Sequence, residues 1–342
     1  MFKIGLDLGY GYVKGVNEAG KEVLFPSLVC EGHDRRLSEL FGGASGSLRD
    51  NIHLVVSDGD SREIFVGDLA KQEGGLISFT LNENKTTHPS TKDLLTAAGF
   101  LLFPDTYTPV HLVTGLPLNQ YLRGKDEFKH MLSKINVSVR HKNEQISKRI
   151  NFAHTTIFPQ AAGAVYHAIW DERSKYFIKG SYLGLIDIGF KTTDFITFLV
   201  EDKLTLINNL SGTINTGISV VQSAISKKFT DKVGSNLDVP ALMRLIENGR
   251  IWFDGSEISF VKEIEAAKQD VAKHIQNNLK SVWGENIRYF HTVFLAGGGA
   301  AMLGHAFSGM HANVVTVKNP QFANAKGFLK VAEAEGRRAA TS

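Results

Sequence analysis

One short pattern occurs twice in this sequence, about half a chain apart, and it constrains the fold more than any other feature. Residues 4–10 read as an apolar run that ends in aspartate, an apolar residue, glycine and an aromatic residue, and residues 184–190 repeat that order. Polar residues and a second apolar run follow each copy. A strand that ends at an Asp-x-Gly turn and returns as a second strand explains both copies. We therefore predict a duplicated domain that contains two equivalent turns.

Other segments predict strands, one long helix and two exposed regions. Residues 258–282 keep apolar side chains three to four positions apart, and Gly284 follows as a typical helix C-cap. Residues 31–50 are polar and glycine-rich, which predicts an exposed loop or mobile insertion, and residues 335–342 predict a frayed tail. Strands that alternate with helices favour an α/β fold. The predicted strands are residues 2–8, 52–56, 110–114, 183–188, 195–200, 292–296 and 313–317.

Length and composition narrow the class of protein. At 342 residues the chain is long enough for two domains, and 38 basic against 35 acidic residues give a net charge of only +3. Because Lys and Arg form no extended run, direct contact with nucleic acid or membrane is not expected. Cys30 is the one cysteine, which excludes an intramolecular disulfide and fits a reducing compartment. The sequence shows neither a signal peptide nor an apolar bilayer span, so we predict a cytoplasmic protein.

Asp7 and Asp187 each end a predicted strand before a glycine turn. Gly9, Gly11 and Gly189 have no side chain, so backbone amides there can approach phosphate oxygens. A carboxylate beside phosphate requires a divalent cation between them, and Mg²⁺ bridges the two while keeping several waters. For either aspartate alone, closing its own β-turn is the simpler explanation. The repeated pair favours a phosphate and Mg²⁺ site.

Two further polar residues are candidates for a role at a phosphate and Mg²⁺ site. Lys14 follows the first turn on the returning strand, where the pleat puts it on the same face as Tyr12. From that face a cation would reach the β- and γ-phosphates of a nucleotide, although a single strand lysine is usually solvated. Gln160 precedes a run of small residues that predicts a closely packed helix, and its amide would orient a water molecule.

Three consecutive glycines, Gly297, Gly298 and Gly299, lie between a predicted strand and a predicted helix start. A bare backbone there would admit a base or ribose, and a helix N-terminus favours negative charge. Tight packing between two elements is the alternative explanation. The spacing matches neither the dinucleotide GxGxxG pattern nor the P-loop GxxxxGK[ST] pattern.

Taken in order, these segments resemble the signature of the actin, sugar kinase and heat-shock chaperone ATPase superfamily. The likeness extends over nearly the whole chain with the order and spacing of the superfamily. Motifs at residues 25–29, 114–121 and 215–221 are most similar to those of the bacterial ParM/StbA plasmid-segregation actins. The main matches are residues 7–14 (DLGYGYVK) with the phosphate-1 turn, 158–165 (FPQAAGAV) with the first connecting helix, 187–194 (DIGFKTTD) with the phosphate-2 turn, 294–303 (FLAGGGAAML) with the adenosine motif and 324–328 (NAKGF) with the second connecting helix.

The resemblance implies a role for each matching residue. Asp7 and Asp187 would hold Mg²⁺ through water, and Gln160 would position the water that attacks the γ-phosphate; these are the candidate catalytic residues. Gly217 and the triple glycine would border the sugar and base. The other implied nucleotide contacts are Gly9, Tyr10, Gly11, Tyr12, Lys14, Gly189, Phe190 and Lys191.

Both turns depart from the family pattern. Tyr10 and Tyr12 stand where many relatives have smaller residues, which implies a different arrangement around the γ-phosphate. Phe190 and Lys191 follow Gly189 where further glycines are usual, so Lys191 either adds a phosphate contact or, as we expect, faces solvent.

The architecture implied by the resemblance is α/β, with two duplicated ribonuclease-H-like domains that flank a nucleotide cleft. The first domain would hold residues 1–157 and 318–342, with an inserted subdomain at about 26–84. The second would hold residues 158–317, with an inserted subdomain at about 218–284. Closure around ATP would link the nucleotide state to the domain angle.

The implied function is Mg²⁺-dependent ATP hydrolysis coupled to polymerisation into head-to-tail cytomotive filaments. The expected role is plasmid or DNA segregation through a DNA-bound adaptor protein. ATP, ADP and Mg²⁺ are the implied ligands, and the motifs leave GTP open. The alternatives are a small-molecule kinase of the same superfamily and a filament scaffold for another cargo. A kinase needs a carboxylate base near its acceptor hydroxyl, and the sequence shows no convincing acidic motif for one.

Overall fold

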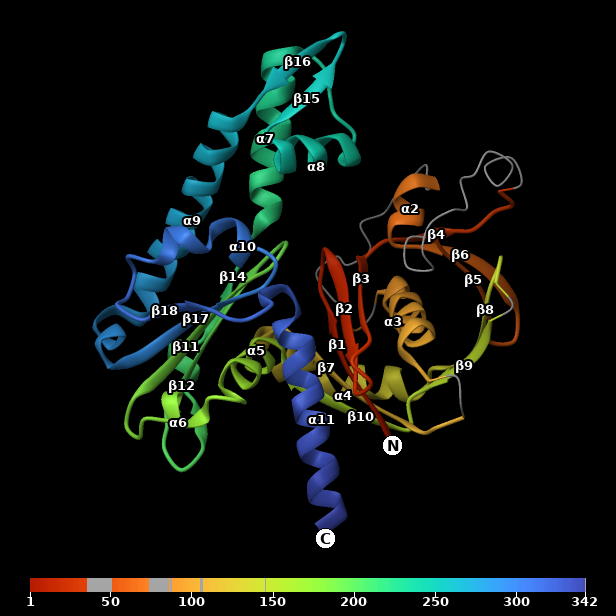
Figure 1. Ribbon diagram of the computed structural model, residues 1–342, viewed down its shortest axis with the longest axis horizontal. Coiled ribbons are helices and arrows are strands. Elements are labelled where there is room, and N and C mark those ends of the chain that lie inside the picture. Colours follow the sequence, from red (N-terminus) through yellow and green to blue (C-terminus); the bar gives the residue numbers. More distant parts are fainter. Residues whose placement is uncertain (36–50, 74–85, 87, 105–106, 145, 342) are drawn as a thin grey trace. The chain divides into compact units, whose positions relative to one another are not determined.

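The chain forms two compact units. Figure 1 shows the ribbon coloured by position in the sequence. The computed structural model describes residues 1–35, 51–73, 86, 88–104, 107–144 and 146–341, apart from the side chains of residues 339–341. Unit 1 comprises Met1–Trp170 and Phe322–Ser342, and unit 2 comprises Asp171–Gln321. The division falls later than the expected breaks after residues 157 and 317. The first break is later because α5 (Gln160–Ile169) packs on α11 (Ala323–Thr341) and therefore belongs to unit 1.

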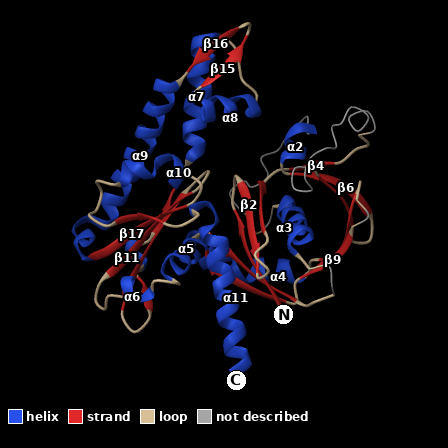
Figure 2. Cartoon of the chain, viewed as in Figure 1, coloured by secondary structure: helices blue, strands red, loops and turns tan. Residues whose placement is uncertain are grey.

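The first sheet of unit 1 has the order β10-β7-β1-β2-β3 (Figure 2). Strands β1, β7 and β10 run parallel, whereas β2 and β3 return antiparallel. Strands β1 and β7 are buried for most of their length, and α11 packs on both, whereas β10 is mostly half-buried. The strand bounds are β1 Phe2–Leu8, β2 Tyr12–Asn17, β3 Glu22–Pro26, β7 Val110–Leu116 and β10 His154–Pro159.

A second sheet of unit 1 has the order β4-β6-β5-β8-β9. Helix α3 contacts strands of both sheets, which places it at the centre of the main apolar core of this unit. Strands β8 and β9 come from residues beyond the 26–84 segment expected to form the inserted subdomain. The elements are β4 Val29–Glu31, β5 Ile52–Ser57, β6 Ser61–Val66, α2 Asp68–Glu73, α3 Pro89–Leu102, α4 Leu118–Ser133, β8 Asn136–His141 and β9 Ser147–Asn151.

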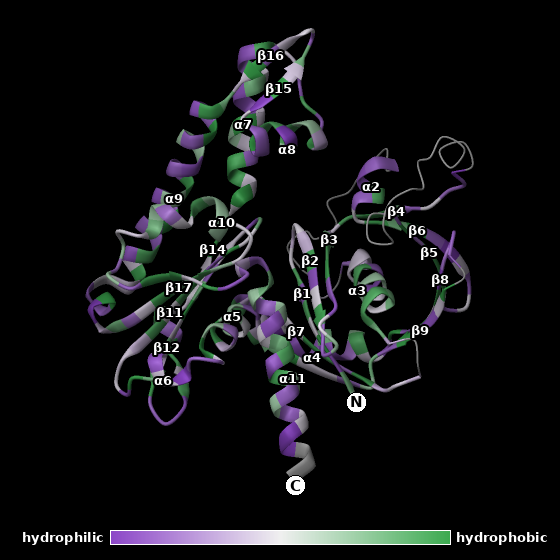
Figure 3. Cartoon of the chain, in the orientation of Figure 1, coloured by the Kyte–Doolittle hydropathy of each residue, from purple (hydrophilic) through white to green (hydrophobic). Residues whose placement is uncertain are grey.

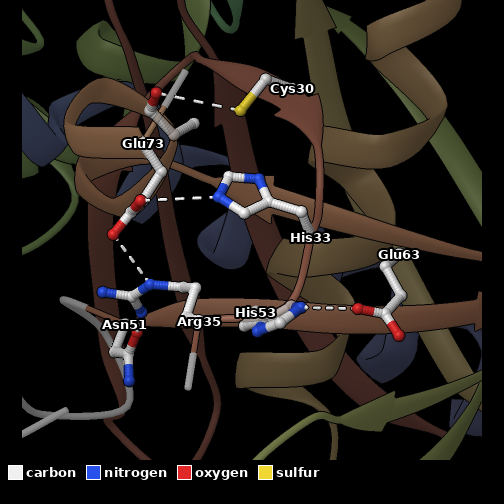
Figure 4. A network of polar contacts seen from close by, with 8 residues as sticks. Cys30, His33, Arg35, Asn51, His53, Glu63 and Glu73 are labelled. Carbon is white, nitrogen blue, oxygen red and sulfur yellow. Dashed lines mark hydrogen bonds and ion pairs between the residues drawn. The ribbon is translucent and has the colours of Figure 1, made fainter. Parts of the chain in front are cut away.

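A polar network lies against this second sheet (Figure 4). The buried Arg35 guanidinium donates through Nε to Glu73 Oε1 at 2.8 Å and through Nη1 to Asn51 Oδ1 at 2.8 Å. His53 Nε2 lies 3.1 Å from Glu63 Oε2. At the start of the predicted exposed loop, residues 31–50, Glu31 ends β4 and residues 32–35 belong to no helix or strand. Glu31, His33 and Asp34 are exposed as predicted, whereas Arg35 is buried. The remainder of the predicted loop, residues 36–50, lies outside the described residues.

The sheet of unit 2 repeats the plan of the first sheet of unit 1. Its order is β13-β12-β11-β17-β18, in which β11, β17 and β18 run parallel and β12 and β13 return antiparallel. This match of order and direction confirms the predicted duplication. The bounds are β11 Tyr182–Ile188, β12 Thr193–Val200, β13 Leu204–Leu206, β14 Gly212–Ile214, β17 Phe290–Ala296 and β18 Val314–Thr316.

Helices and one hairpin complete unit 2. The long helix α9 begins at Val261, three residues later than predicted, because Ile258 belongs to strand β16. Apolar and polar bands alternate along α9 in Figure 3, and Gly284 is its C-cap as predicted. The elements are α6 Arg173–Tyr176, η1 Asn208–Leu210, α7 Ile218–Val233, α8 Val239–Asn248, β15 Arg250–Phe253, β16 Ser256–Ser259, α9 Val261–Trp283, η2 Gly284–Tyr289, α10 Ala300–Leu303, η3 Gly304–Phe307 and η4 Pro320–Phe322.

The C-terminal residues are helical, so the predicted frayed tail at 335–342 is wrong for the described residues. Helix α11 continues to Thr341. The Arg337 guanidinium lies 5.5 Å from the centre of the Trp170 ring, and Glu335 lies 3.4 Å from His111. These tertiary contacts hold the last turns in place. Within the described part of the chain, no helix has both the length and the apolar content needed to cross a bilayer.

Candidate functional site

A buried carboxylate with two polar partners lies near the end of β1, just before the first turn (residues 9–11, between β1 and β2). Asp7 is 2% exposed. Its Oδ2 lies 3.1 Å from the Lys14 ammonium, and its Oδ1 accepts a hydrogen bond of 2.8 Å from Gln160 Nε2. Lys14 reaches Asp7 because the two residues pair in the antiparallel register of β1 and β2. Three of the predicted site residues therefore meet in unit 1.

The backbone of the first turn is tightly constrained. Gly9 N–H donates to Tyr12 C=O at 3.1 Å, and a Cβ on Gly9 would lie 2.6 Å from Lys14 Nζ. A Cβ on Gly9 would also lie 2.7 Å from the backbone oxygen of Tyr12, so the turn requires glycine. Ser27 Oγ donates to Gly9 C=O at 2.7 Å, and Ser27 N–H donates to Gly11 C=O at 2.9 Å. Ser27 therefore holds the turn in place. It belongs to the motif at residues 25–29, but this role was not predicted for it.

The two predicted tyrosines lie on either side of this turn. Tyr10 is half-buried, and its hydroxyl accepts a hydrogen bond of 2.9 Å from Gln120 Nε2 on α4. Tyr12 begins β2, opposite Pro26, and is also half-buried. The hydrogen bond to Gln120 on α4 restrains Tyr10 beside the turn.

Helix α5 presents Gln160 as its first residue, with 8% of the residue exposed. Small residues let α5 approach α11 closely, since a Cβ on Gly327 would lie 1.7 Å from Gly163 C=O. Asn324 Oδ1 also accepts a hydrogen bond from Ala164 N–H at 3.1 Å. The two predicted connecting helices therefore exist and pack on each other, and this contact sets the position of Gln160.

The second turn, residues 189–192 between β11 and β12, copies the first. Asp187 is 5% exposed, and Gly189 N–H donates to Thr192 C=O at 2.9 Å, as Gly9 does to Tyr12. Asp187 pairs with Asp194 in the register where Asp7 pairs with Lys14. The two turns therefore share geometry but differ in the charge opposite the leading carboxylate.

The N-terminus of α7 seats directly on the second turn. Ile218 N–H donates to Gly189 C=O at 3.1 Å, and Ser219 N–H donates to Phe190 C=O at 2.8 Å. A Cβ on Gly217 would lie 2.5 Å from Phe190 C=O, so only glycine allows this approach. Lys191 is half-buried within the turn.

The triple glycine lies against the same strand end. Gly297 has φ +85°, and a Cβ there would lie 2.3 Å from Asp187 Oδ1. Gly299 N–H donates to Ile188 C=O at 2.8 Å, whereas Gly298 is exposed. The following helix α10 spans only Ala300–Leu303. The expected attraction of this helix for negative charge is therefore small, since one turn carries little of a macrodipole.

A Pro-Gln pair occurs near the outer parallel strand of the first sheet of unit 1 and again near that of the unit 2 sheet. Pro159 ends β10 and Gln160 begins α5, whereas Pro320 and Gln321 lie in η4, a few residues after β18. Pro320 C=O accepts a hydrogen bond of 2.9 Å from Gly297 N–H. Sequence comparison of the two halves beyond the aspartate turns would have shown this pair.

The donor set of each unit fits a hydrated Mg²⁺ rather than a directly bound ion. Both oxygens of Asp7 already accept from Lys14 and Gln160. Each carboxylate oxygen keeps a second lone pair, so a water of the hydrated ion can still donate to it. Mg²⁺ loses its water reluctantly, and contact through water therefore suits both Asp7 and Asp187.

Two family models match this chain. The model for the N-terminal domain of actin-like proteins matches residues 5–163. The model for the C-terminal part of archaeal MreB-like actin homologues matches residues 185–309. A curated archaeal actin homologue from Thermoplasma acidophilum is 23% identical over 345 residues, which cover 97% of this chain and 99% of that protein.

Solved structures agree with the family models. A ParM from Clostridium botulinum, solved as a 15-stranded filament, is 34% identical to this chain, with a TM-score of 0.90 over 97% of this chain and 99% of that one. An archaeal actin homologue solved in complex with ADP is 22% identical, with a TM-score of 0.81 over 98% of this chain and 100% of that one.

Proposed function

Because this chain belongs to the actin-like protein family, we propose that it is a Mg²⁺-dependent ATPase that assembles head to tail into filaments. The observation that carries the proposal is the likeness to the filament-forming ParM, at 34% identity over 97% of the chain. The two Asp-x-Gly turns provide carboxylates and backbone amides of the kind that Mg²⁺-dependent ATP hydrolysis requires. The archaeal homologue solved with ADP supports nucleotide binding on the same fold.

Each of the two turns would contribute contacts to a bound nucleotide. On the unit 1 side the contacts are Gly9, Tyr10, Gly11, Tyr12 and Lys14, whose amides and ammonium suit the β- and γ-phosphates. On the unit 2 side they are Gly189, Phe190, Lys191, Gly217, Gly297, Gly298 and Gly299. The glycines among them leave the backbone open to phosphate, ribose and base. The bound Mg²⁺ would neutralise phosphate charge, and Asp7 and Asp187 would orient its waters. ATP is the proposed nucleotide, and GTP is a competitor to test.

The contact between Gln160 and Asp7 suggests how hydrolysis proceeds. A carboxylate only accepts hydrogen bonds, so the Gln160 NH₂ must face Asp7 and its amide oxygen must point the other way. That oxygen can accept a hydrogen bond from a water in line with the γ-phosphate. An amide is too weak a base to remove the proton, so Gln160 acts by orientation.

The proposed cellular role is plasmid or DNA segregation in the cytoplasm through a DNA-bound adaptor. The likeness to ParM and the balanced charge support this role. A head-to-tail contact between identical subunits generates an open polymer. Direct contact with nucleic acid or membrane forms no part of the proposal. The kinase alternative would require an acceptor that raises ATP turnover.

The test is light scattering and pelleting of the purified protein with ATP-Mg²⁺, ADP-Mg²⁺ or no nucleotide. We expect scattering to rise with ATP-Mg²⁺ and to decay as phosphate is released. Asp187→Asn should assemble without the decay. Asp202→Asn, an exposed carboxylate of unit 2, serves as the matched control. ATP binding without any rise in scattering would reject the filament proposal and favour the kinase or a scaffold, which an acceptor screen then separates.

A further inference from the structure

Two histidines and a glutamate meet on the first sheet of unit 1, at the end opposite the first turn. His111 is the second residue of β7, and His154 is the first residue of β10. The two pair directly in the parallel register, so their rings project from the same face of the sheet. Glu335 reaches them from α11. Asp7 and Gln160 lie at the carboxyl ends of β1 and β10, so this cluster is separate from the nucleotide half-site.

The three side chains have the spacing of metal ligands. One ligand atom from each lies within 4.8 Å of the others. Zn–N and Zn–O bonds of about 2.0–2.2 Å put neighbouring ligands of a tetrahedral site about 3.3–3.5 Å apart. His111 Nε2 and Glu335 Oε2 are already 3.4 Å apart. The His154 side chain is exposed and is therefore free to adjust by the remaining ångström.

We propose that His111, His154 and Glu335 form a binding site for a divalent transition-metal ion of the Zn²⁺ class, with water as the fourth ligand. Two imidazoles and one carboxylate suit Zn²⁺, whereas Mg²⁺ and Ca²⁺ prefer ligands that are all oxygen. Among the described residues, this is the one group of three such side chains with ligand atoms this close.

The surroundings of the cluster support this assignment. Thr156 Oγ1 donates to Glu335 Oε2 at 2.8 Å and so orients the carboxylate, as outer-shell partners of metal ligands do. The nearby ammonium of Lys3 opposes a cation, but it pairs with Glu18 at 2.7 Å.

The bound ion would fasten the last turns of α11 to β7 and β10. Binding would therefore stabilise unit 1, because the unfolded chain does not hold these three residues together. This effect requires neither nucleotide nor assembly, so the site can be tested whether or not the protein is an ATPase.

The test uses the full chain, stripped of metal with EDTA, exchanged into buffer without EDTA and kept free of nucleotide. We expect isothermal titration with ZnCl₂ to show one tight site, and CoCl₂ to give the intense visible bands of tetrahedral Co²⁺. His154→Asn and Glu335→Gln should each weaken Zn²⁺ binding about tenfold or more and abolish the Co²⁺ bands. The rise in Tm with Zn²⁺ should disappear with them.

Two choices keep the outcome decisive. The variants alter an exposed histidine and a half-exposed glutamate rather than the buried His111, so circular dichroism should confirm a native fold. His305→Asn, at an exposed histidine of unit 2, is the matched control and should bind Zn²⁺ like the unaltered protein. Equal Zn²⁺ affinity in the unaltered chain, His154→Asn and Glu335→Gln would overturn the proposal, as would the absence of tetrahedral Co²⁺ bands.

Discussion

Gln160 Nε2 donates a 2.8 Å hydrogen bond to Asp7 Oδ1 across 153 residues of sequence. This bond links the first residue of α5 to the strand that carries the first turn. It fixes which end of the Gln160 amide faces the carboxylate. The position of the amide oxygen therefore depends on a contact that exists before any nucleotide binds.

Replacing Gln160 with alanine should slow ATP hydrolysis by about 100-fold while leaving ATP affinity within a few-fold, because the residue orients water rather than holding phosphate. Single-turnover phosphate release and binding of a fluorescent ATP analogue measure the two effects separately. Gln276→Ala is the matched control, since Gln276 Nε2 bonds Ala306 C=O within unit 2. Unchanged phosphate release in Gln160→Ala would remove Gln160 from the mechanism.

Gly327→Ala should destabilise the protein by about 1–3 kcal/mol or more, because the new Cβ would lie 1.7 Å from Gly163 C=O and force α5 and α11 apart. Gly336→Ala lies in the same helix, where the Cβ meets only the flexible Lys3 Cε at 3.1 Å. That control should be neutral or up to about 1 kcal/mol more stable. Urea denaturation compares the two, and equal stabilities would refute the close crossing.

Gly297→Ala should cost about 1–3 kcal/mol of stability, because alanine is strained at φ +85°. The substitution should also weaken ATP binding, because the new Cβ would lie 2.3 Å from Asp187 Oδ1 and displace that carboxylate. Gly309→Ala has open space around the new Cβ and should change neither property. Thermal denaturation and a nucleotide-binding titration would test both statements, and a Gly297→Ala protein with native ATP affinity would contradict the second.

The protein should lose stability as the pH falls below about 6.5, in part because of His53. Burial is the main cause that lowers the pKa of His53, despite its contact with Glu63. Among the described residues, no group bonds its buried Nδ1, where a second proton would sit. As pH falls, His53 therefore takes up a proton in the unfolded chain before it does so in the folded protein. Its contribution to the free energy of unfolding is complete above the pKa of His53 in the unfolded chain. It is lost progressively as pH falls toward the lower pKa in the folded protein.

The measurement is the free energy of unfolding in urea between pH 7.5 and 5.5, in metal-free buffer, for the unaltered protein and His53→Gln. The advantage of the unaltered protein should shrink as pH falls, while His305→Asn should follow the unaltered protein throughout. A difference that stays constant with pH would exclude His53 as a contributor.

Much of the fold was predictable because its central strands are short segments rich in apolar residues. The runs at residues 2–8, 110–114 and 183–188 lie within β1, β7 and β11, and the repeated Asp-x-Gly pattern predicted the duplication. Strand type depends on local pattern, which one sequence contains. The end of α11 does not follow from local pattern, because residues 335–338 are ordered by Trp170 and His111.

The sequence predicted which residues lie around the two turns of the candidate site, but it did not predict which of them contact one another. Glycines at 9, 217 and 297 were identified by type, and the structure explains each by a collision that a Cβ would cause. The bond between Asp7 and Gln160 and the support from Ser27 join distant segments. A single sequence does not show which distant segments meet, so these contacts needed coordinates.

The interrupted sequence of unit 1 has a consequence for the order of folding during synthesis. Helix α11 covers β1 and β7, yet the ribosome makes it only after all of Asp171–Gln321. At about 5–20 residues per second, that segment takes roughly 8–30 seconds to synthesise. During this interval the sheet face that will receive Phe328 and Val331 has no covering helix. Unit 2 is continuous and can fold first, so unit 1 is completed last although its chain begins first, and its waiting sheet is the surface that a chaperone would need to shield.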